Sequence, residues 1–453
     1  MSSHNPLVSA PILTSIWRLS LPNMSAMLAV AGVSIAETAY IGRLGMSQLA
    51  GIALVFPMIM LQQMLSSGAI GGGISAAISR AIGAGDKAKA NALVLHAAVI
   101  GLGLGLITSL IFLLWGRDIF ALIGGARGAA LDHAMDYANI AFSCAISVWL
   151  TNAFASALRG SGNMKTPASV LLWVAIGQIC LGGILGLGLG PVPPFGMAGI
   201  AAGQALAFSA GALYLYRYLR RGQGGVWLAF SLDLKRDCFM DIVRVGAMAA
   251  ISSVQTVATI LILTRIVAEF GPEALAGYGI GTRLEFLLIP ITFAIGMACV
   301  PLVGMAMGAG KVQRARQVAW TGAALAGTVV GVIGVLVALF PGSWSTLFTS
   351  NPAVLAVAGD YFSWTGPCYA FFGFGLCLYF ASQGAGKLLG PVLAGTLRLV
   401  LVAGGGIVLL SQGASVASLF VLIGAAMLAY GVATGLAVYF VSWQRSDGCF
   451  PKQ

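Results

Sequence analysis

The sequence is short of charged residues. Only 8% of its 453 residues are charged and 59% are hydrophobic, whereas soluble globular domains carry about 25% charged residues. This shortage excludes an ordinary soluble protein, and the mean hydropathy of +0.95 is typical of a chain that lies in a bilayer. Acidic residues are fewer than basic ones, with 13 Asp and Glu against 24 Lys and Arg. The resulting net charge of +11 would also fit nucleic-acid binding. The distribution of the basic residues along the chain distinguishes nucleic-acid binding from a role in membrane topology.

Patterns for metal binding, disulfides and catalysis are missing as well. The three histidines (His4, His96 and His133) are scattered without metal-ligand spacing. The seven cysteines form no CxxC pair and fall almost entirely in apolar or inner-side segments, which is not a disulfide framework. The chain has no HExxH, no loop DxxxD run and no Ser/His/Asp set. We therefore expect no enzyme, no cofactor and no bound metal.

Long apolar runs recur from end to end. Each is about 20 residues or more, long enough for a hydrocarbon core of about 30 Å, and a span in lipid must satisfy its own backbone as a helix. The sequence predicts an all-α integral membrane protein with twelve transmembrane helices. Their expected ranges are 16–41, 51–75, 91–115, 136–158, 168–189, 196–219, 242–266, 277–303, 317–341, 361–382, 390–411 and 416–442.

Basic residues are distributed unevenly between the two sides. With an inner N-terminus, eighteen Lys and Arg fall in inner segments, and only Arg43, Arg117 and Arg127 fall in outer ones. This asymmetry is a positive-inside signal. It predicts a multi-pass protein of the cell (inner) membrane with both termini in the cytoplasm. Because the basic charge sets the topology, nucleic-acid binding is not expected.

The two halves of the chain share a sequence pattern. Residues 135–167 resemble 359–391 at an offset of 224, and a shorter block agrees at an offset of 225. The matched pairs are Asp136/Asp360, Tyr137/Tyr361, Cys144/Cys368, Gly160/Gly384, Gly162/Gly386, Pro167/Pro391 and Gly83-Ala84-Gly85/Gly308-Ala309-Gly310. A third block also agrees: Gly45, Leu49, Ala50 and Gly51 match Gly271, Leu275, Ala276 and Gly277. The three blocks follow the same order in both halves.

The repeat predicts two lobes of six helices. Because six is even, both copies enter the membrane from the same side, and a pseudo-twofold axis along the membrane normal should relate them. We predict an N-lobe at 1–220, a cytoplasmic linker at 221–241 and a C-lobe at 242–453. Two such lobes around a central cavity suit a transporter that exposes the cavity to each side in turn.

Only two acids lie well inside predicted spans, Glu37 and Glu285. A charged residue at the centre of a span costs about 2.5–3.5 kcal/mol on insertion scales, and a buried carboxyl escapes part of that cost by holding a proton. We predict that both residues couple transport to a cation. Arg43 follows Glu37 by six positions, which is about 9 Å along a helix and places the two side chains on different faces. We therefore do not expect Arg43 to pair directly with Glu37. For Glu285, an ion pair with Arg265 or Arg398 remains an equal alternative.

Polar and adaptable side chains inside the spans are candidates for substrate binding. Buried amides need hydrogen bonds, and methionine and aromatic residues suit flat hydrophobic cations. The predicted substrate-binding residues are Met27, Ser34, Gln62, Phe142, Trp149, Asn152, Gln178, Gln204, Gln255 and Arg283.

Over essentially its whole length the chain resembles the multidrug and toxic compound extrusion (MATE) family. Family members read xDTxxxxRLG where this chain has Glu37-Thr38 and Arg43-Leu44-Gly45, and GxRxE where it has Gly281-Thr282-Arg283-Leu284-Glu285. They read LRGxGDTxxP at Leu158–Pro167, where this chain has Asn163 in place of the Asp. The resemblance implies a secondary antiporter that exports cationic amphiphilic compounds against an inward H+ or Na+ gradient.

Departures from the family pattern bear on the coupling ion. The NorM-like branch uses two second-lobe acids at positions that hold Gln255 and Phe372 here. The DinF-like branch uses a first-helix Asp, often with an Asn-x-x-x-Asp pair at the positions of Gln178 and Gly182. The chain therefore looks DinF-like with one acid, Glu37, in its first lobe. One carboxyl with amide neighbours suffices for a proton, whereas sodium needs several oxygen ligands.

Other interpretations stay open at this point. Na+ coupling is one, and a lipid-linked oligosaccharide flippase of the same superfamily is another, although its cavity should hold several basic residues. The expected partners are small cationic amphiphilic drugs, protons or Na+, and the lipid bilayer. We expect the protein to act as a monomer.

Overall fold

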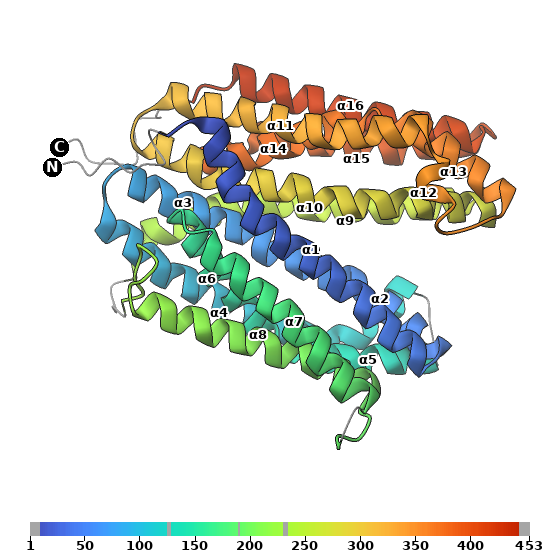
Figure 1. Cartoon of the computed structure of the whole chain (residues 1–453), viewed down its shortest axis with the longest axis horizontal. Helices are drawn as coiled ribbons and strands as arrows, with labels where there is room; N and C mark the ends of the chain where they lie inside the picture. The colour runs from blue at the N-terminus through green and yellow to red at the C-terminus, as the bar shows by residue number, and fades with distance from the viewer. Residues whose placement is uncertain (1–9, 125–127, 189–190, 230–233, 444–453) are drawn as a thin grey trace. The chain divides into compact units, whose positions relative to one another are not determined.

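The computed structural model describes residues 10–124, 128–188, 191–229 and 234–443, and the regular elements in these ranges are all helices (Figure 1). The predicted all-α class is confirmed. Arg127, Arg445, Lys452 and His4, which entered the charge and histidine counts, lie outside the described residues.

The first half of the chain contains nine helical elements. They are α1 (Ile12–Leu44), α2 (Met46–Gln63), the π-helix η2 (Met64–Ile70), α3 (Gly71–Gly83), α4 (Lys87–Gly124), α5 (Ala129–Ser143), α6 (Ala145–Gly160), α7 (Lys165–Leu187) and α8 (Gly196–Arg220). The second half contains α9 (Arg236–Ala268), α10 (Pro272–Gly308), α11 (Val312–Leu339), α12 (Gly342–Ser345), α13 (Pro352–Thr365), α14 (Tyr369–Ala385), α15 (Leu389–Ser411) and α16 (Val416–Phe440).

Ten helical segments in the described residues are long and apolar enough to cross a membrane. An eleventh span results if α5 and α6, which meet at a bend of 47°, are counted together. The remaining predicted span falls on α13 and α14, which are separated by residues 366–368. Each predicted span therefore falls on one continuous helical segment or on a broken pair of helices; the span 51–75 falls on the continuous segment of α2, η2 and α3.

Both broken spans are interrupted at the same place in the repeat. Cys144 separates α5 from α6 with φ −95° and ψ 16°, outside the helical range. Its counterpart Cys368 lies directly before α14, where the Gly366-Pro367 step precedes it. Because proline cannot donate a backbone hydrogen bond and restricts the residue before it, the interruption of the second copy has a local cause.

The described chain forms two compact units. The N-terminal unit comprises Trp17–Ile78 and Asp86–Val257, and the C-terminal unit comprises Ala258 onward together with the segments ending at Ile16 and at Gly85. In the N-terminal unit, α7 packs along α8 and α4 packs along α6; in the C-terminal unit, α14 packs between α10 and α11. The lobe boundaries predicted from the sequence stay a prediction.

Small residues let the helices within each unit approach closely. A Cβ on Gly160 would lie 2.8 Å from the Ser75 carbonyl oxygen, and a Cβ on Gly384 would lie 2.5 Å from the Val300 carbonyl oxygen. The two crossings, α6 on α3 and α14 on α10, correspond at the repeat offsets of 224 and 225. The repeated sequence therefore makes a repeated helix contact, as close packing in lipid favours.

Candidate functional site

Glu37 lies in a polar cluster inside the N-terminal unit. The Gln178 amide nitrogen on α7 donates a hydrogen bond to Glu37 Oε1 at 2.8 Å. The Tyr137 hydroxyl on α5 lies 3.4 Å from Glu37 Oε2 and 2.9 Å from the Gln204 amide oxygen on α8. Four helices thus supply the cluster, which we call the Glu37 cluster: Glu37, Tyr137, Gln178 and Gln204.

The Tyr137 hydroxyl carries one hydrogen and faces two acceptors. At 2.9 Å, Gln204 is the closer acceptor; Glu37 at 3.4 Å is the more distant one. If Tyr137 donates to Gln204, a protonated Glu37 can donate to the tyrosine oxygen and complete a directed chain of hydrogen bonds. If Glu37 is ionised, the tyrosine hydrogen is drawn to the carboxylate and Gln204 loses its donor. The geometry therefore allows one proton on Glu37 to change a contact on α8.

Glu37 forms no ion pair among the residues that the structure describes. Its contacts are an amide and a hydroxyl, and the side chain of Arg43 is exposed near the end of α1. This agrees with the six-residue spacing between Glu37 and Arg43, which predicts no direct pair. A carboxyl held only by neutral groups has no fixed countercharge, which leaves it free to bind a proton or a cation.

Glycine brings α7 close to α1 near the cluster. A Cβ on Gly183 would lie 3.1 Å from the ring of Tyr40, which follows Glu37 by three residues and so shares its face of α1. A larger residue would press on this ring, and Gln178 lies on the same helix as Gly183. The close approach therefore helps to hold the amide within reach of the carboxylate.

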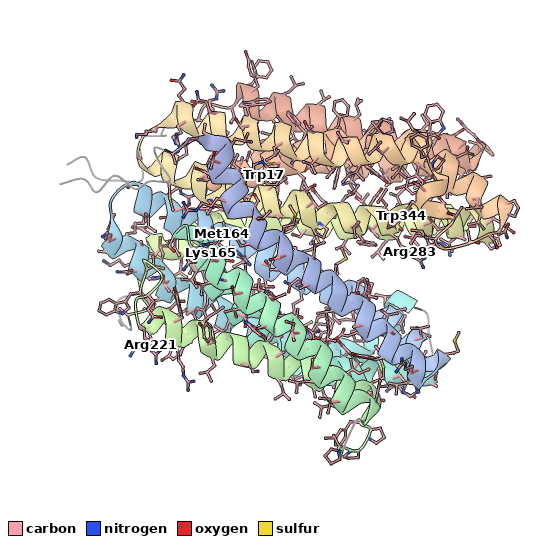
Figure 2. All side chains as sticks on the ribbon, in the orientation of Figure 1. Trp17, Met164, Lys165, Arg221, Arg283 and Trp344 are labelled. Carbon is pink, nitrogen blue, oxygen red and sulfur yellow. The ribbon has the colours of Figure 1, made fainter. Side chains whose placement is uncertain are left out.

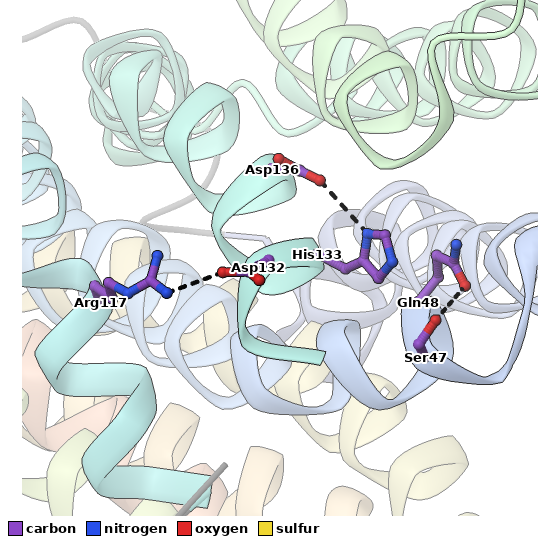
Figure 3. A network of polar contacts seen from close by, with 6 residues as sticks. All are labelled: Ser47, Gln48, Arg117, Asp132, His133 and Asp136. Carbon is purple, nitrogen blue, oxygen red and sulfur yellow. Dashed lines mark hydrogen bonds and ion pairs between the residues drawn. The ribbon is translucent and has the colours of Figure 1, made fainter. Parts of the chain in front are cut away.

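Polar contacts hold the start of α5, the helix that carries Tyr137. Arg117 on α4 pairs with Asp132 at 2.9 Å, and His133 lies 3.5 Å from Asp136, the residue before Tyr137 (Figure 3). In the same view, Ser47 on α2 donates to Gln48 at 2.9 Å. Arg117, Asp132 and Asp136 are largely exposed, so the ion pairs that they form contribute little energy. Of the three contacts, only the Arg117–Asp132 pair joins α4 to α5.

Glu285 on α10 lies beside a second tyrosine pair in the C-terminal unit. The Tyr361 hydroxyl donates to Glu285 Oε1. Glu285, Thr292, Tyr369 and Phe372 line a cavity that leaves about 10 Å³ for the centre of a water molecule, about the least that one water needs. The Tyr369 hydroxyl is buried and has no hydrogen-bond partner in the described part of the chain.

Neither arginine considered as a partner of Glu285 forms an ion pair with it among the described residues. Arg265 pairs at 2.8 Å with Glu269, which directly follows the end of α9. The Arg398 guanidinium lies 4.8 Å from the centre of the Phe372 ring, at the lining of the same cavity. The alternative pair with Arg265 is therefore replaced by a local one. Arg398 lies beside a residue that lines the cavity, and no ion pair between it and Glu285 is found in the described part of the chain.

Three predicted substrate residues, Asn152 and Trp149 on α6 and Gln62 on α2, are buried. The Asn152 amide nitrogen donates to Ser66 at 2.8 Å and to Gln63 at 3.3 Å. Gln62 is buried, and its amide nitrogen has no partner in the described residues. Trp149 donates to Thr108 at 3.1 Å and is buried.

The other predicted substrate residues have varied surroundings. The Phe142 ring stacks on Phe112 at 3.8 Å in the core of the N-terminal unit. Arg283 is exposed and lies over Phe348 at 4.9 Å (Figure 2). Met27 and Ser34 on α1 and Gln255 on α9 are half-buried. Gln178 and Gln204 are the two that the structure brings to Glu37, and the role of all ten in binding stays a prediction.

Three residues of interest were missing from the predicted site. Tyr137 and Tyr361 are matched by the sequence repeat, which was the signal that could have selected them. Arg159 on α6 is 1% exposed, and its Nε and Nη2 atoms have no hydrogen-bond partner in the described residues. The sequence does not indicate that an arginine at the end of an apolar helix is buried.

Comparison with known proteins places this arrangement in a family. The family model MatE matches residues 22–184 and 248–408. The chain belongs to the MatE family. Members of this family are membrane transporters, so the MatE chain is a multi-pass membrane transporter and not an enzyme.

Relatives agree with this assignment. The MatE chain is 28% identical over 364 residues to an FAD transporter of Shewanella oneidensis, covering 78% of each chain. It is 26% identical over 407 residues to the probable multidrug resistance protein YoeA of Bacillus subtilis, covering 86% of each. A solved MOP superfamily transporter from Pyrococcus furiosus superposes with a TM-score of 0.87 at 22% identity, over 96% of both chains. That likeness confirms the fold.

Proposed function

We propose that this MatE transporter exports cationic amphiphilic compounds across the inner membrane in exchange for protons, with Glu37 carrying the coupling proton. The observation that carries the proposal is the Glu37 cluster, in which an intramembrane carboxyl has one amide and one hydroxyl as neighbours and forms no ion pair with any described residue. Relatives named for multidrug resistance or export, such as the multidrug export protein MepA of Staphylococcus aureus at 27% identity over 311 residues, support the substrate class.

The cluster suits a proton better than a sodium ion. Sodium takes several oxygen ligands, while Gln178 presents its amide nitrogen to Glu37 and the Tyr137 oxygen lies 3.4 Å away. A proton needs only the carboxyl and one acceptor, which Tyr137 provides. Because Tyr137 also reaches Gln204 on α8, proton binding at α1 changes the contacts of α8. A changed helix contact is the link that coupling requires.

The energetic consequence follows from the charge balance. One proton entering for each monovalent cation leaving moves no net charge. Exchange would then draw about 1.4 kcal/mol from each unit of pH gradient and nothing from the membrane voltage. The inner-membrane location, the cytoplasmic termini and the monomeric state belong to the same proposal.

The proposal is tested in proteoliposomes loaded with a fluorescent cationic dye such as ethidium, under a pH gradient or a Na+ gradient imposed separately. We expect exchange under the pH gradient alone, and loss of that exchange in Glu37→Gln. Glu273→Gln, an exposed acid in the first turn of α10, is the matched control and should exchange dye normally. Dye exchange at the normal rate in Glu37→Gln would contradict the role of Glu37.

Flavin dinucleotide export is a second candidate function. The relative named FAD transporter supports it, and FAD carries an anionic diphosphate. Within the N-terminal unit, Arg159 is a buried cation, and two of its nitrogens have no hydrogen-bond partner among the described residues. These two nitrogens could bind a phosphate once the surrounding helices separate. Uptake of FAD into inverted vesicles, compared with ethidium uptake, distinguishes the two functions.

A further inference from the structure

Two side chains of α4 bind the linker that joins the two halves of the chain. The backbone N–H of Trp227 donates to Asn91 Oδ1 at 2.9 Å, and the backbone N–H of Lys235 donates to His96 Nε2 at 2.9 Å. All four residues lie within Asp86–Val257 of the N-terminal unit, so both contacts are internal to that unit. The described part of the linker is therefore docked on the first copy of the repeat.

His96 is fully buried, and both of its ring nitrogens are engaged. Nδ1 lies 2.7 Å from the carbonyl oxygen of Ala92, one turn earlier in α4, and Nε2 faces the N–H of Lys235. A carbonyl oxygen cannot donate a hydrogen bond, and a backbone N–H cannot accept one. Nδ1 must therefore carry the hydrogen and Nε2 the lone pair, which is the neutral form of the imidazole.

A second proton on His96 would break its bond to the linker. The new Nε2–H would face the N–H of Lys235 across 2.9 Å, so that two donors would oppose one another. The proton would also place a positive charge in a buried site that packs against the Phe239 ring at 4.6 Å. An opposed donor and a buried charge are both unfavourable. Docking of the linker therefore requires the neutral ring and weakens as the pH falls.

The charged groups on the segments that pack here are mostly basic. They are Lys87 and Lys89 on α4, Arg159 on α6, Lys235 before α9, Arg236 and Arg244 on α9, and the acids Asp86, Asp237 and Asp241. Asp241 pairs with Lys89 at 2.6 Å, and Asp237 is exposed. The acids of α5 include Asp132, which pairs with Arg117 near the opposite end of α4. Within the described chain no carboxylate pairs with His96, so none of these acids directly compensates a charged imidazole.

We propose that His96 is a pH-sensitive latch for the linker. The neutral imidazole holds Lys235 and the start of α9 on α4, and protonation of His96 releases them. We call the His96–Lys235 hydrogen bond the linker latch. The basic residues around it place it on the cytoplasmic side under the positive-inside rule. The order of the linker then depends on the pH of the cytoplasm, whichever compound or coupling ion the transporter carries.

The first experiment observes the imidazole directly. The chain has only three histidines, so protein labelled with 15N-histidine gives few NMR signals, and the spectrum of His96→Gln identifies those of His96 by difference. In liposomes at about pH 8 we expect the neutral ring with its hydrogen on Nδ1. Lowering the pH to about 5 crosses the range in which histidine gains its charge and should add the second hydrogen. A hydrogen on Nε2 at pH 8, or a ring that stays neutral throughout, would overturn the inference.

The second experiment follows the linker itself. Leu234 is exposed and lies directly before Lys235. A nitroxide spin label on Leu234→Cys, in a variant whose seven native cysteines are replaced, reports motion beside the latch. Its spectrum should lose the restricted component between about pH 8 and pH 5, with the same midpoint as the protonation of His96. A label that stays restricted at both ends of this range would contradict the latch. No substrate is needed, so the result stands even if ethidium is not carried.

Two substitutions of His96 separate the hydrogen bond from the size of the side chain. Glutamine can present an oxygen where Nε2 lies and does not titrate, so His96→Gln should keep the label restricted at every pH. Leucine has no acceptor, so His96→Leu should give a mobile label at every pH. His133→Gln is the matched control, because His133 lies beside Asp136 in α5 and should leave the pH response intact. If the pH response persists in His96→Gln, another group releases the linker and the inference is wrong.

Discussion

Tyr137 and Tyr361, which are 224 positions apart, each place a hydroxyl against a carboxylate inside a membrane-spanning helix. The tyrosines occupy equivalent positions of the repeat, but the acids do not. Glu37 comes from the first span of the first copy, and Glu285 comes from α10, the second span of the second copy. The duplicated scaffold thus retains the hydroxyl while the acid reaches it from a different helix.

Removing the Tyr137 hydroxyl should impair coupling. In Tyr137→Phe the ring still fills the core, where Tyr137 is fully buried, but Glu37 Oε2 and the Gln204 amide oxygen lose the one hydroxyl that faces both of them. We expect about a tenfold slower proton-driven dye exchange, equivalent to about 1.4 kcal/mol. The pH giving half-maximal exchange should change, because the carboxylate loses the hydroxyl that lies beside it.

The equivalent substitution in the second copy is the matched control. Tyr361→Phe should leave that pH unchanged if Glu37 alone carries the coupling proton. An identical shift in both variants would show that Glu285 shares the coupling role, and an unchanged profile in Tyr137→Phe would contradict the hydrogen-bond chain.

A second carboxylate beside Glu37 should change the ion that drives transport. The Gln178 amide nitrogen lies 2.8 Å from Glu37 Oε1, so Gln178→Glu brings two carboxyl groups together. Such a pair either shares a proton or takes up a cation. We expect dye exchange to gain a response to a Na+ gradient, measured with the pH clamped. Gln178→Met, of similar volume but without oxygen, should gain none.

The repeated helix crossing predicts matched losses of stability. Gly160→Ala and Gly384→Ala each press a Cβ against backbone oxygen, at 2.8 Å from Ser75 and 2.5 Å from Val300. Each should lower the free energy of unfolding by about 1–3 kcal/mol, measured as a lower Tm in detergent. Gly103→Ala in α4, where a Cβ would meet nothing within 4 Å, should keep or raise the Tm.

The burial of Arg159 should lower the free energy of unfolding. Its side chain is 1% exposed and two of its nitrogens lack partners in the described residues, and a buried charge without compensation is unfavourable. Arg159→Met should therefore raise the free energy of unfolding by about 1 kcal/mol or more. Arg117→Met, at an exposed ion pair, should change it by less than about 1 kcal/mol.

The same variant separates the two proposed functions. If Arg159 binds the phosphates of a flavin dinucleotide, Arg159→Met loses FAD transport while ethidium exchange continues. A lower Tm in Arg159→Met would instead show that the arginine has a stabilising partner.

Much of the fold could be predicted from sequence because a span in lipid has few alternatives. Long apolar runs predicted the helices, and matched residues such as Cys144 and Cys368 fall where the structure interrupts α5–α6 and α13–α14. The interruptions themselves were not predicted. A break of one to three residues leaves the hydropathy of a span almost unchanged, so it carries no signal of its own.

The site was predictable only in part. Glu37 was conspicuous because a carboxyl in an apolar run is expensive, and Gln178 and Gln204 were selected as buried amides. The tyrosine that joins them was not selected, because tyrosine is common in apolar spans. Of the two arginines considered as partners of Glu285, Arg265 pairs instead with Glu269, which directly follows the end of α9.

The sequence by itself determined the helices, the repeat and the two acids in the membrane, since each follows from the cost of leaving backbone or charge unsatisfied in lipid. Only the tertiary structure decided which polar side chains meet. Glu37 finds Tyr137 and Gln178 at 100 and 141 positions along the chain. Such contacts depend on how whole helices pack against one another, and that packing is set by many small van der Waals terms rather than by any local pattern.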